Sequence, residues 1–136
     1  MNSEKIRANI RPMIPQDLIW IKPIALKHNE WRTIRDTLFR KNDTLALCCW
    51  VIEGKAMVGL SEEMEDPTIT YASGLCDNRG IKELFQLGRF LTTLARGFGL
   101  TLYSPEITQG SWQERFYEKM DFKRLDDSHF ILPAED

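Results

Sequence analysis

The sequence predicts one α/β domain of the α+β type that covers residues 1–136. Segments with the short apolar runs of β-strands alternate along the chain with segments whose apolar residues recur every three or four positions, as in amphipathic helices. A hairpin signal, Glu53-Gly54, joins two of the predicted strands directly. The length of 136 residues, with 43% hydrophobic and 28% charged residues, is typical of a single soluble domain. No repeat, low-complexity stretch or internal linker interrupts the pattern.

The first third of the chain predicts a strand followed by two helical segments. The strand is expected over Ile6–Met13. Pro15 and Asp17 then favour a helix start, because proline is tolerated in a first turn and a carboxylate there interacts favourably with the helix dipole. Pro23 is expected to kink or split this helix. A second helix is predicted over Glu30–Arg40, where apolar residues recur at spacings of three and four.

Strands dominate the middle of the chain. Thr44–Ile52 is almost continuously apolar, as expected of a strand that is buried on both faces. The hairpin turn leads back into Lys55–Leu60, and Thr68–Leu75 is a further strand of β-branched and small residues. The connection before that last strand is acidic, and its carboxylates would either bind a cationic amine or, as we favour, form a solvated loop. These carboxylates belong to Glu62, Glu63, Glu65 and Asp66.

A long helix is predicted after the turn Cys76–Gly80. Its apolar stripe repeats at spacings of three and four, which indicates one buried face. The stripe consists of Leu84, Leu87, Leu91, Leu94 and Phe98. Gly88 lies on the same side and would allow close approach to the sheet, whereas Gly97 and Gly99 are expected to end the helix.

The last quarter of the chain predicts a strand, a helix and two closing strands. Leu100–Tyr103 is a short strand, and Ser111 is a favourable N-cap residue for the helix that follows. The expected inner face of this helix is formed by Trp112, Phe116 and Met120. The closing strands are predicted over Phe122–Leu125 and His129–Leu132.

Charge and cysteine content exclude several functions. Eighteen Lys and Arg against twenty Asp and Glu give a net charge of -2 without a basic run, so nucleic acid is not an expected partner. The sequence has no run of 18 apolar residues, so no membrane span is predicted, and we expect no secretion signal at its start. Cys48, Cys49 and Cys76 are an odd number without zinc-site spacing, so we expect reduced thiols in a cytoplasmic protein. His28 and His129 stand far apart, so no metal site is predicted.

Two segments resemble one known family. Residues Phe116–Lys123, F-Y-E-K-M-D-F-K, resemble the F-Y-E-K-x-G-F-K segment of the GNAT family of N-acyltransferases. Ile10–Leu18 is similar to the I-R-x-x-x-x-x-D entry into that family's first strand and helix. The resemblance implies a single GNAT-like domain, with a central mixed, mostly antiparallel sheet flanked by helices. Small GNAT-like proteins of tailed bacteriophages are similar in size and share a degraded glycine loop.

The resemblance implies acetyl-CoA as co-substrate, held through its pyrophosphate by a turn of the form R-x-x-G-x-G at a helix N-terminus. Here residues 78–83 are N-R-G-I-K-E, so the turn keeps one glycine and departs elsewhere. Arg79 and Lys82 would either pair with the pyrophosphate or form a solvated helix start, whereas Glu83 would repel a phosphate. A backbone N–H near Leu75 would polarise the thioester carbonyl. The residues expected at the cofactor are Leu75, Cys76, Arg79, Gly80, Ile81 and Lys82.

Tyr117 is the candidate catalytic residue. It matches the family's tyrosine beside the thioester sulfur, and the resemblance implies that it protonates the leaving thiolate. The competing interpretation is a packing corner, with the ring over the sheet and the hydroxyl in water. A general base for the amine is not singled out, because Glu65, Asp66 and ordered water all remain candidates.

Two functions from different classes follow. The first is an acetyl-CoA-dependent N-acetyltransferase that acts by direct transfer on an unidentified amine, either a small molecule or a protein. The second is a catalytically inactive GNAT-fold protein, of the phage-encoded type, that binds a partner protein or serves as a virion or assembly component. Neither function involves nucleic acid or a membrane, and the sequence is compatible with a homodimer or another protein partner.

Overall fold

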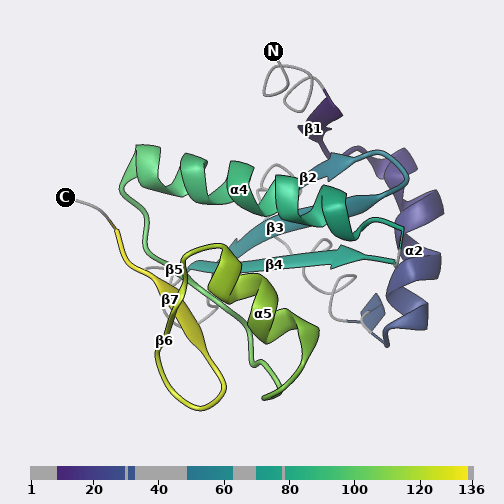
Figure 1. The fold of residues 1–136 in the computed structure, drawn as a ribbon. Helices are drawn as coiled ribbons and strands as arrows, with labels where there is room; N and C mark the ends of the chain where they lie inside the picture. Colours follow the sequence, from purple (N-terminus) through teal and green to yellow (C-terminus); the bar gives the residue numbers. More distant parts are fainter. Residues whose placement is uncertain (1–8, 30, 33–48, 63–69, 78, 135–136) are drawn as a thin grey trace. The chain divides into compact units, whose positions relative to one another are not determined.

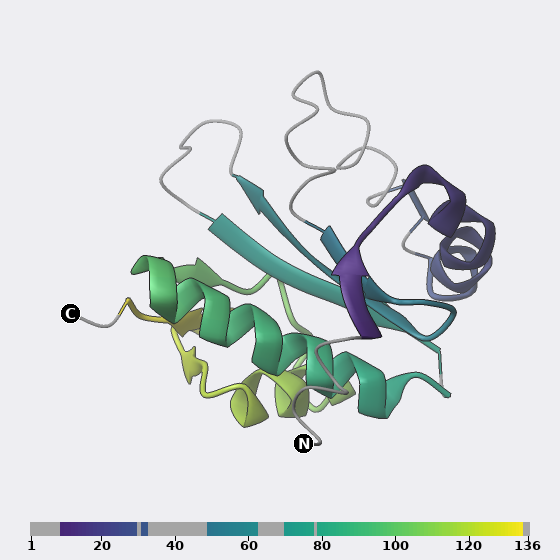
Figure 2. The ribbon, with the colours of Figure 1, turned by 90° about the horizontal axis from the view of Figure 1, so that it is seen from above.

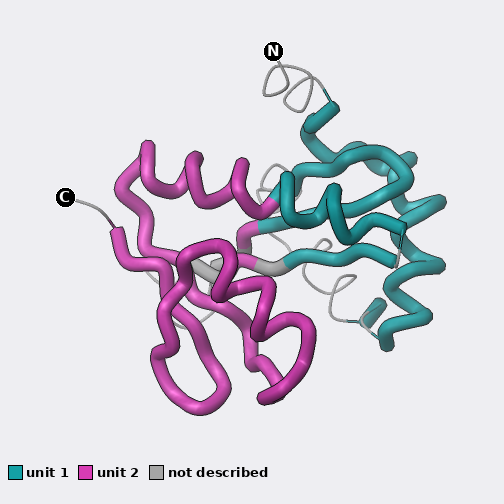
Figure 3. Tube along the Cα trace, in the orientation of Figure 1, with its two compact units in different colours: residues 1–59, 74–87 teal, residues 60–73, 88–136 magenta. Residues whose placement is uncertain are grey.

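A computed structural model describes residues 9–29, 31–32, 49–62, 70–77 and 79–134 (Figure 1). The predicted helix over Glu30–Arg40 lies almost wholly outside these residues. The first part of the predicted strand Thr44–Ile52 also lies outside them, and so do residues 63–67 of the acidic connection expected at Ser61–Pro67. The chain divides into two compact units (Figure 3). The first unit comprises residues 1–59 and 74–87, and the second comprises residues 60–73 and 88–136.

The first unit contains three antiparallel strands. β1 (Ile10–Pro12) pairs with β2 (Cys49–Ile52), and β2 pairs with β3 (Ala56–Glu62) through its first residues. The predicted hairpin is confirmed, since the Lys55 N–H donates to the Ile52 carbonyl at 2.9 Å across the turn. Gly54 has φ 74°, a left-handed conformation that glycine adopts without strain.

α2 (Leu18–Lys27) follows a short 3-10 turn, η1 (Pro15–Asp17), and packs on the hairpin (Figure 2). Of the two effects expected of Pro23, a kink or a split, the split does not occur, because α2 continues through it. The unit is held together by apolar burial from α2, the hairpin and β4 (Thr70–Cys76). The buried cluster consists of Ile21, Ile24, Ala25, Cys49, Val51, Met57 and Leu75.

The long helix is confirmed as α4 (Ile81–Phe98), with residues 81–87 in the first unit and 88–98 in the second. Leu84, Leu87 and Leu91 are buried as predicted. Phe98, by contrast, is 74% exposed, and Ala95 is buried instead. At 3.6 residues per turn, a residue eleven positions beyond Leu84 returns to the same face, so the buried line passes through Ala95.

In the second unit, residues 70–73 of β4 are followed across the sheet by β5, β7 and β6, in that order. β5 (Leu102–Tyr103) runs parallel to β4, and β7 (Phe130–Leu132) runs antiparallel to both β5 and β6 (Lys123–Arg124). The two closing strands are therefore confirmed, and so is a mixed, mostly antiparallel arrangement.

α5 (Trp112–Lys119) lies against α4 within the second unit, and Gly88 makes this approach possible. A Cβ at Gly88 would lie 2.7 Å from Met120 Sδ and 2.9 Å from Phe116 Cζ. The expectation that Gly88 faces the sheet is therefore wrong. The glycine that brings α4 close to a strand is Gly74 on β4, where a Cβ would lie 2.8 Å from Leu84 Cδ1.

The start of α5 also differs from the prediction. Ser111 is the N-cap residue, but its side chain makes no capping hydrogen bond. Trp112 is 46% exposed, whereas Phe116 and Met120 are buried as expected. Trp112 and Phe116 make an edge-to-face contact, with ring centroids 6.4 Å apart. The first turn of α5 is therefore less buried than the rest of its inner face.

Candidate functional site

Tyr117 stands in an aromatic corner at the end of α5. Its side chain is 3% exposed, and its hydroxyl donates a hydrogen bond to the Ala72 carbonyl at 2.7 Å. The ring meets Phe116 and Phe122 edge-on, at centroid distances of 5.2 and 5.0 Å, and stacks on Phe130 at 6.1 Å. The hydroxyl therefore does not reach water, as the packing interpretation supposed, but binds the main chain of β4.

Ala72 lies at the point where the parallel ladder of β4 and β5 ends. In the part of the chain that the structure describes, the ladder consists of the pairs Thr70–Leu102 and Tyr71–Tyr103. β4 itself runs on to Cys76. The Tyr117 hydroxyl thus gives a hydrogen-bond donor to the first β4 carbonyl beyond this ladder.

The end of α5 explains how the corner is built. The Phe122 N–H donates to the Tyr117 carbonyl and the Asp121 N–H to the Glu118 carbonyl, both at 3.1 Å, which together form a Schellman C-cap. Asp121 has φ 69°, the left-handed conformation that this cap requires. The contact between the Tyr117 and Phe122 rings is the apolar contact that accompanies such a cap. The cap therefore fixes the position of Tyr117.

The turn before α4 belongs to the first unit. The Arg79 N–H donates to Asp77 Oδ1 at 2.9 Å, and the Gly80 N–H donates to the Asp77 carbonyl at 3.0 Å. The Leu84 N–H donates to the Gly80 carbonyl at 2.8 Å, so Gly80 precedes the first helical residue. Ile81, Lys82 and Arg79 are exposed there, as a helix start in contact with solvent would be.

Gly80 packs against protein. A Cβ at this position would overlap the Lys55 carbonyl oxygen and would lie 3.1 Å from the Cβ of Cys76. Only glycine therefore fits beside the turn of the β2–β3 hairpin. The absence of a side chain makes room for the main chain of this turn, which is a structural reason for glycine that the sequence does not reveal.

Leu75 and Cys76 are buried, at 6% and 4% exposure. Burial first, and then the negative charges of Asp77 and Glu83, raise the pKa of the Cys76 thiol to about 11. The thiol is thus protonated at neutral pH and is a poor nucleophile. What these two residues can offer a ligand is their backbone, since the Leu75 side chain lies in the core of the first unit.

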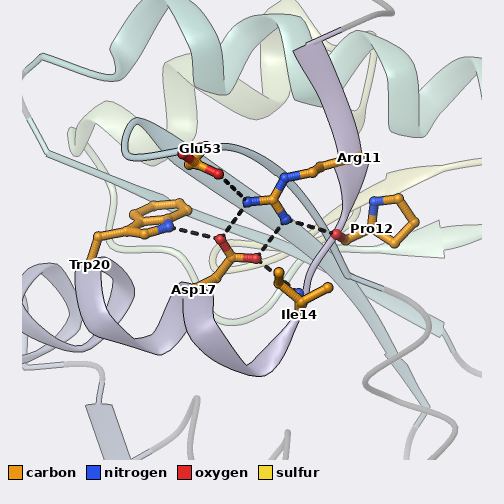
Figure 4. Close-up of polar contacts among 6 residues, drawn as sticks. All are labelled: Arg11, Pro12, Ile14, Asp17, Trp20 and Glu53. Carbon is orange, nitrogen blue, oxygen red and sulfur yellow. Dashed lines mark hydrogen bonds and ion pairs between the residues drawn. The ribbon is translucent and has the colours of Figure 1, made fainter.

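The sequence motif near the N-terminus forms a compact polar network (Figure 4). Arg11 makes a two-point contact with Asp17, at 2.8 and 2.7 Å, and also bonds Glu53 at 2.8 Å. Asp17 further accepts hydrogen bonds from the Ile14 N–H at 2.8 Å and from Trp20 Nε1 at 2.9 Å. Because Asp17 is 2% exposed, these donors replace its lost hydration.

The fold is similar to those of solved acetyltransferase structures. An N-acetyltransferase from Staphylococcus aureus Mu50 matches with a TM-score of 0.69 and 17% identity, over 93% of this chain and 98% of that one. A GNAT family acetyltransferase from Brucella melitensis in complex with acetyl-CoA matches with a TM-score of 0.59 and 17% identity, over 93% and 88%. The chain has the GNAT acetyltransferase fold.

A third similar structure is that of a mutant of a cAMP-binding acyltransferase from Mycobacterium smegmatis. It matches with a TM-score of 0.52 and 12% identity, over 93% of this chain but 44% of that chain. No protein-family model matches the sequence, and no curated protein does so either. The likeness therefore concerns the fold.

Within this GNAT fold, both segments that resemble the family's sequences have a local structural role. Arg11 and Asp17 connect β1 to the start of α2, and residues 116–123 form the α5 cap and its exit into β6. Asp121 occupies the left-handed position where the GNAT segment has glycine. In the described part of the chain, no helix is long and apolar enough to cross a membrane, and no group of three or more metal-ligating side chains is found.

Proposed function

We propose that this protein is an acetyl-CoA-dependent N-acetyltransferase that transfers the acetyl group directly to an amine. The observation that carries the proposal is the end of the β4–β5 ladder at Tyr71 and Tyr103, with the Tyr117 hydroxyl on the next β4 carbonyl. A parallel ladder that stops while one strand continues leaves main-chain donors and acceptors for an extended ligand. The fold likeness to three acyltransferases, one in complex with acetyl-CoA, supports this choice.

Three roles follow from the proposal. The Leu75 N–H polarises the thioester carbonyl, because a fixed main-chain donor stabilises the negative charge that develops on that oxygen. Tyr117 protonates the leaving thiolate after its hydroxyl turns away from Ala72, which costs one hydrogen bond. The amine must lose a proton before it attacks, since a free lysine is neutral in only about one molecule in 2,500 at pH 7. Glu65 and Asp66 are candidate bases outside the described residues, and ordered water is a third.

A non-catalytic function is the second candidate. The hydrogen bond between Asp77 and the Arg79 N–H, together with the contact of Gly80 with Lys55, favours it, because both use the turn before α4 for internal contacts. In this case the protein would bind a partner protein or serve as a virion or assembly component. The site near Tyr117 is then purely structural.

Removing the Tyr117 hydroxyl tests the catalytic role. In Tyr117→Phe, we expect acetyl transfer to a panel of amines, measured as thiol release from acetyl-CoA, to fall about 100-fold, as is typical when a general acid is lost. Thr92→Val is the matched control, because Thr92 is also buried and its hydroxyl also donates to a main-chain carbonyl, that of Arg89 at 3.0 Å.

Both variants lose one buried hydroxyl, so both should lose about 1–3 kcal/mol of stability. A turnover that falls only in Tyr117→Phe supports the proposal. Equal turnover in the two variants would remove Tyr117 from the mechanism. Failure of wild-type protein to release thiol with any amine, or to bind acetyl-CoA in calorimetry, would favour the non-catalytic function.

A further inference from the structure

The turn before α4 contains its own anion. One carboxylate oxygen of Asp77 accepts the Arg79 N–H at 2.9 Å, and the Asp77 carbonyl accepts the Gly80 N–H at 3.0 Å. Main-chain N–H groups in such a turn are the donors that a phosphate oxygen would use at a helix N-terminus. A carboxylate on one of them occupies that donor and adds a negative charge beside the remaining ones.

Gly80 does not open this turn to a phosphate either. Glycines admit a phosphate because the backbone can approach it closely. At Gly80 the space that a Cβ would take is filled by the Lys55 carbonyl of the β2–β3 turn. The approach that Gly80 permits is thus between two segments of the first unit.

Charges around the turn also balance. Residues 77–83 carry two cationic side chains, Arg79 and Lys82, and two anionic ones, Asp77 and Glu83, so their formal charges sum to zero. Glu83 lies in the first helical turn, where a carboxylate already interacts with the positive end of the helix dipole. The turn therefore does not fit a pyrophosphate.

We propose, on the basis of the function proposed above, that Asp77 is a specificity-determining residue that keeps the nucleotide half of the donor from being bound at this turn. The donor is then recognised through its acyl-pantetheine arm, which pairs with the main chain of β4. Acyl-pantetheine thioesters would serve as substrates whether or not they carry the nucleotide. No chemical step depends on the pyrophosphate.

Two thioester probes and two substitutions test the assignment. Acetyl-CoA and acetyl-pantetheine, which lacks the nucleotide, are titrated calorimetrically into wild type, Asp77→Asn and Asp77→Ala. We expect the two probes to bind wild type within about threefold of each other. Asp77→Ala should bind acetyl-CoA about tenfold more tightly, equivalent to about 1.4 kcal/mol, with unchanged affinity for acetyl-pantetheine. Asp77→Asn should show a smaller gain, because the amide oxygen can still accept the Arg79 N–H.

Asp126 provides a matched control. Its Oδ1 accepts the N–H of Ser128, two residues on, at 2.8 Å, which is the contact that Asp77 makes with Arg79. Asp126→Asn and Asp126→Ala make the same charge change at a similar turn in the β6–β7 connection, where they also remove the contact of Asp126 with His129 Nδ1 at 2.9 Å. We expect them to leave the affinity for both probes unchanged. Salt should weaken the gain in Asp77→Ala, since the interaction that is relieved is electrostatic.

The outcomes separate this inference from the function on which it rests. Wild type that binds acetyl-CoA at least 100-fold more tightly than acetyl-pantetheine, with no effect of either Asp77 substitution, overturns the role of Asp77 and leaves the acetyltransferase standing. Wild-type affinities for the two probes within about threefold, with a gain for acetyl-CoA alone in Asp77→Ala, support the role of Asp77. No binding of either probe to any variant, with all variants folded by circular dichroism, overturns both.

Discussion

Asp17 shows how a single buried carboxylate connects separate segments. Its hydrogen bonds with Arg11, aided by those from the Ile14 N–H and Trp20, lower its pKa from 3.8 to about 2 despite burial. Arg11 also bonds Glu53 in the hairpin turn, so the network ties β1, η1 and the hairpin of the first unit. The side chains of Arg11 and Asp17 are 32% and 3% exposed, so the pair is largely shielded from solvent on one side only.

The pH dependence of stability follows from this pKa. Because the folded pKa of Asp17 is below its unfolded value, its contribution is complete above about pH 4 and is lost as the pH falls toward 2. One pKa unit corresponds to about 1.36 kcal/mol. Solvent reaches the partly exposed Arg11 and screens the ion pair, so we expect the pair to contribute about 1–2 kcal/mol to stability. The difference in unfolding free energy between wild type and Asp17→Asn, measured in urea, should be largest near pH 6 and shrink between pH 4 and 2.

Glu53→Gln is the companion variant for this measurement. Glu53 bonds the same Arg11, but its side chain is 76% exposed, so its removal should cost less than about 1 kcal/mol. Equal losses at pH 6 for the two variants would show that Arg11, rather than the buried carboxylate, dominates the network.

α4 and α5 end in the same kind of C-cap, so the residues at the equivalent cap position can be exchanged between them. α4 ends like α5: the Leu100 N–H donates to the Ala95 carbonyl at 2.8 Å and the Gly99 N–H to the Arg96 carbonyl at 3.2 Å, with Gly99 at φ 68°. Asp121 holds the equivalent position in α5. A non-glycine residue pays a steric cost in this conformation, which glycine does not.

Asp121→Gly should therefore stabilise the protein by about 0.5–1 kcal/mol, and Gly99→Asp should destabilise it by about 1 kcal/mol. The ion pair of Asp121 with Arg96, at 3.5 Å, is exposed on the aspartate side and should contribute little. Thermal unfolding of the two variants is the measurement. A loss of stability in Asp121→Gly would indicate that the aspartate makes a contribution beyond its backbone conformation.

Two glycines of α4 distinguish packing from helix propensity. Gly88 faces Met120 and Phe116 of the α5 corner, at 2.7 and 2.9 Å from a Cβ, whereas a Cβ at Gly97 would meet nothing within 4 Å. Alanine is favoured over glycine in a helix by up to about 1 kcal/mol. Gly97→Ala should therefore stabilise by about 0.5–1 kcal/mol, while Gly88→Ala should destabilise by about 1–3 kcal/mol through overpacking. The free energy of unfolding in urea is measured for both variants. Stabilisation in both would contradict overpacking at Gly88 and would show that α5 moves to accommodate the added methyl group.

The elements that the sequence predicts well are those set by local pattern. The Glu53-Gly54 hairpin, the stripe through Leu84, Leu87 and Leu91, and the closing strands depend on turn residues and periodicity alone. The faces that Gly88 and Phe98 take up depend on which neighbour reaches the helix, and this information is not local. For the same reason the sequence marks Tyr117 but not the Ala72 carbonyl that its hydroxyl binds, 45 residues away.

At the scale of the whole molecule, the two compact units share elements. β4 contributes residues 70–73 to one unit and 74–76 to the other, and α4 is divided between residues 87 and 88. Helical hydrogen bonds span four residues, so unfolding one half of α4 frays the first turn of the other. This continuity favours one cooperative transition, as a single domain over residues 1–136 would show.

Hydrogen exchange resolves this prediction along the chain. Core amides of the first unit, such as those of Val51 and Met57, should exchange with the same free energy of opening as those of Leu102 and Phe130 in the second. Increasing urea should lower both values with one common slope, because the same global unfolding exposes them. Two distinct free energies with different urea slopes would instead define two folding units, and the junctions within β4 and α4 would then be the places where opening begins.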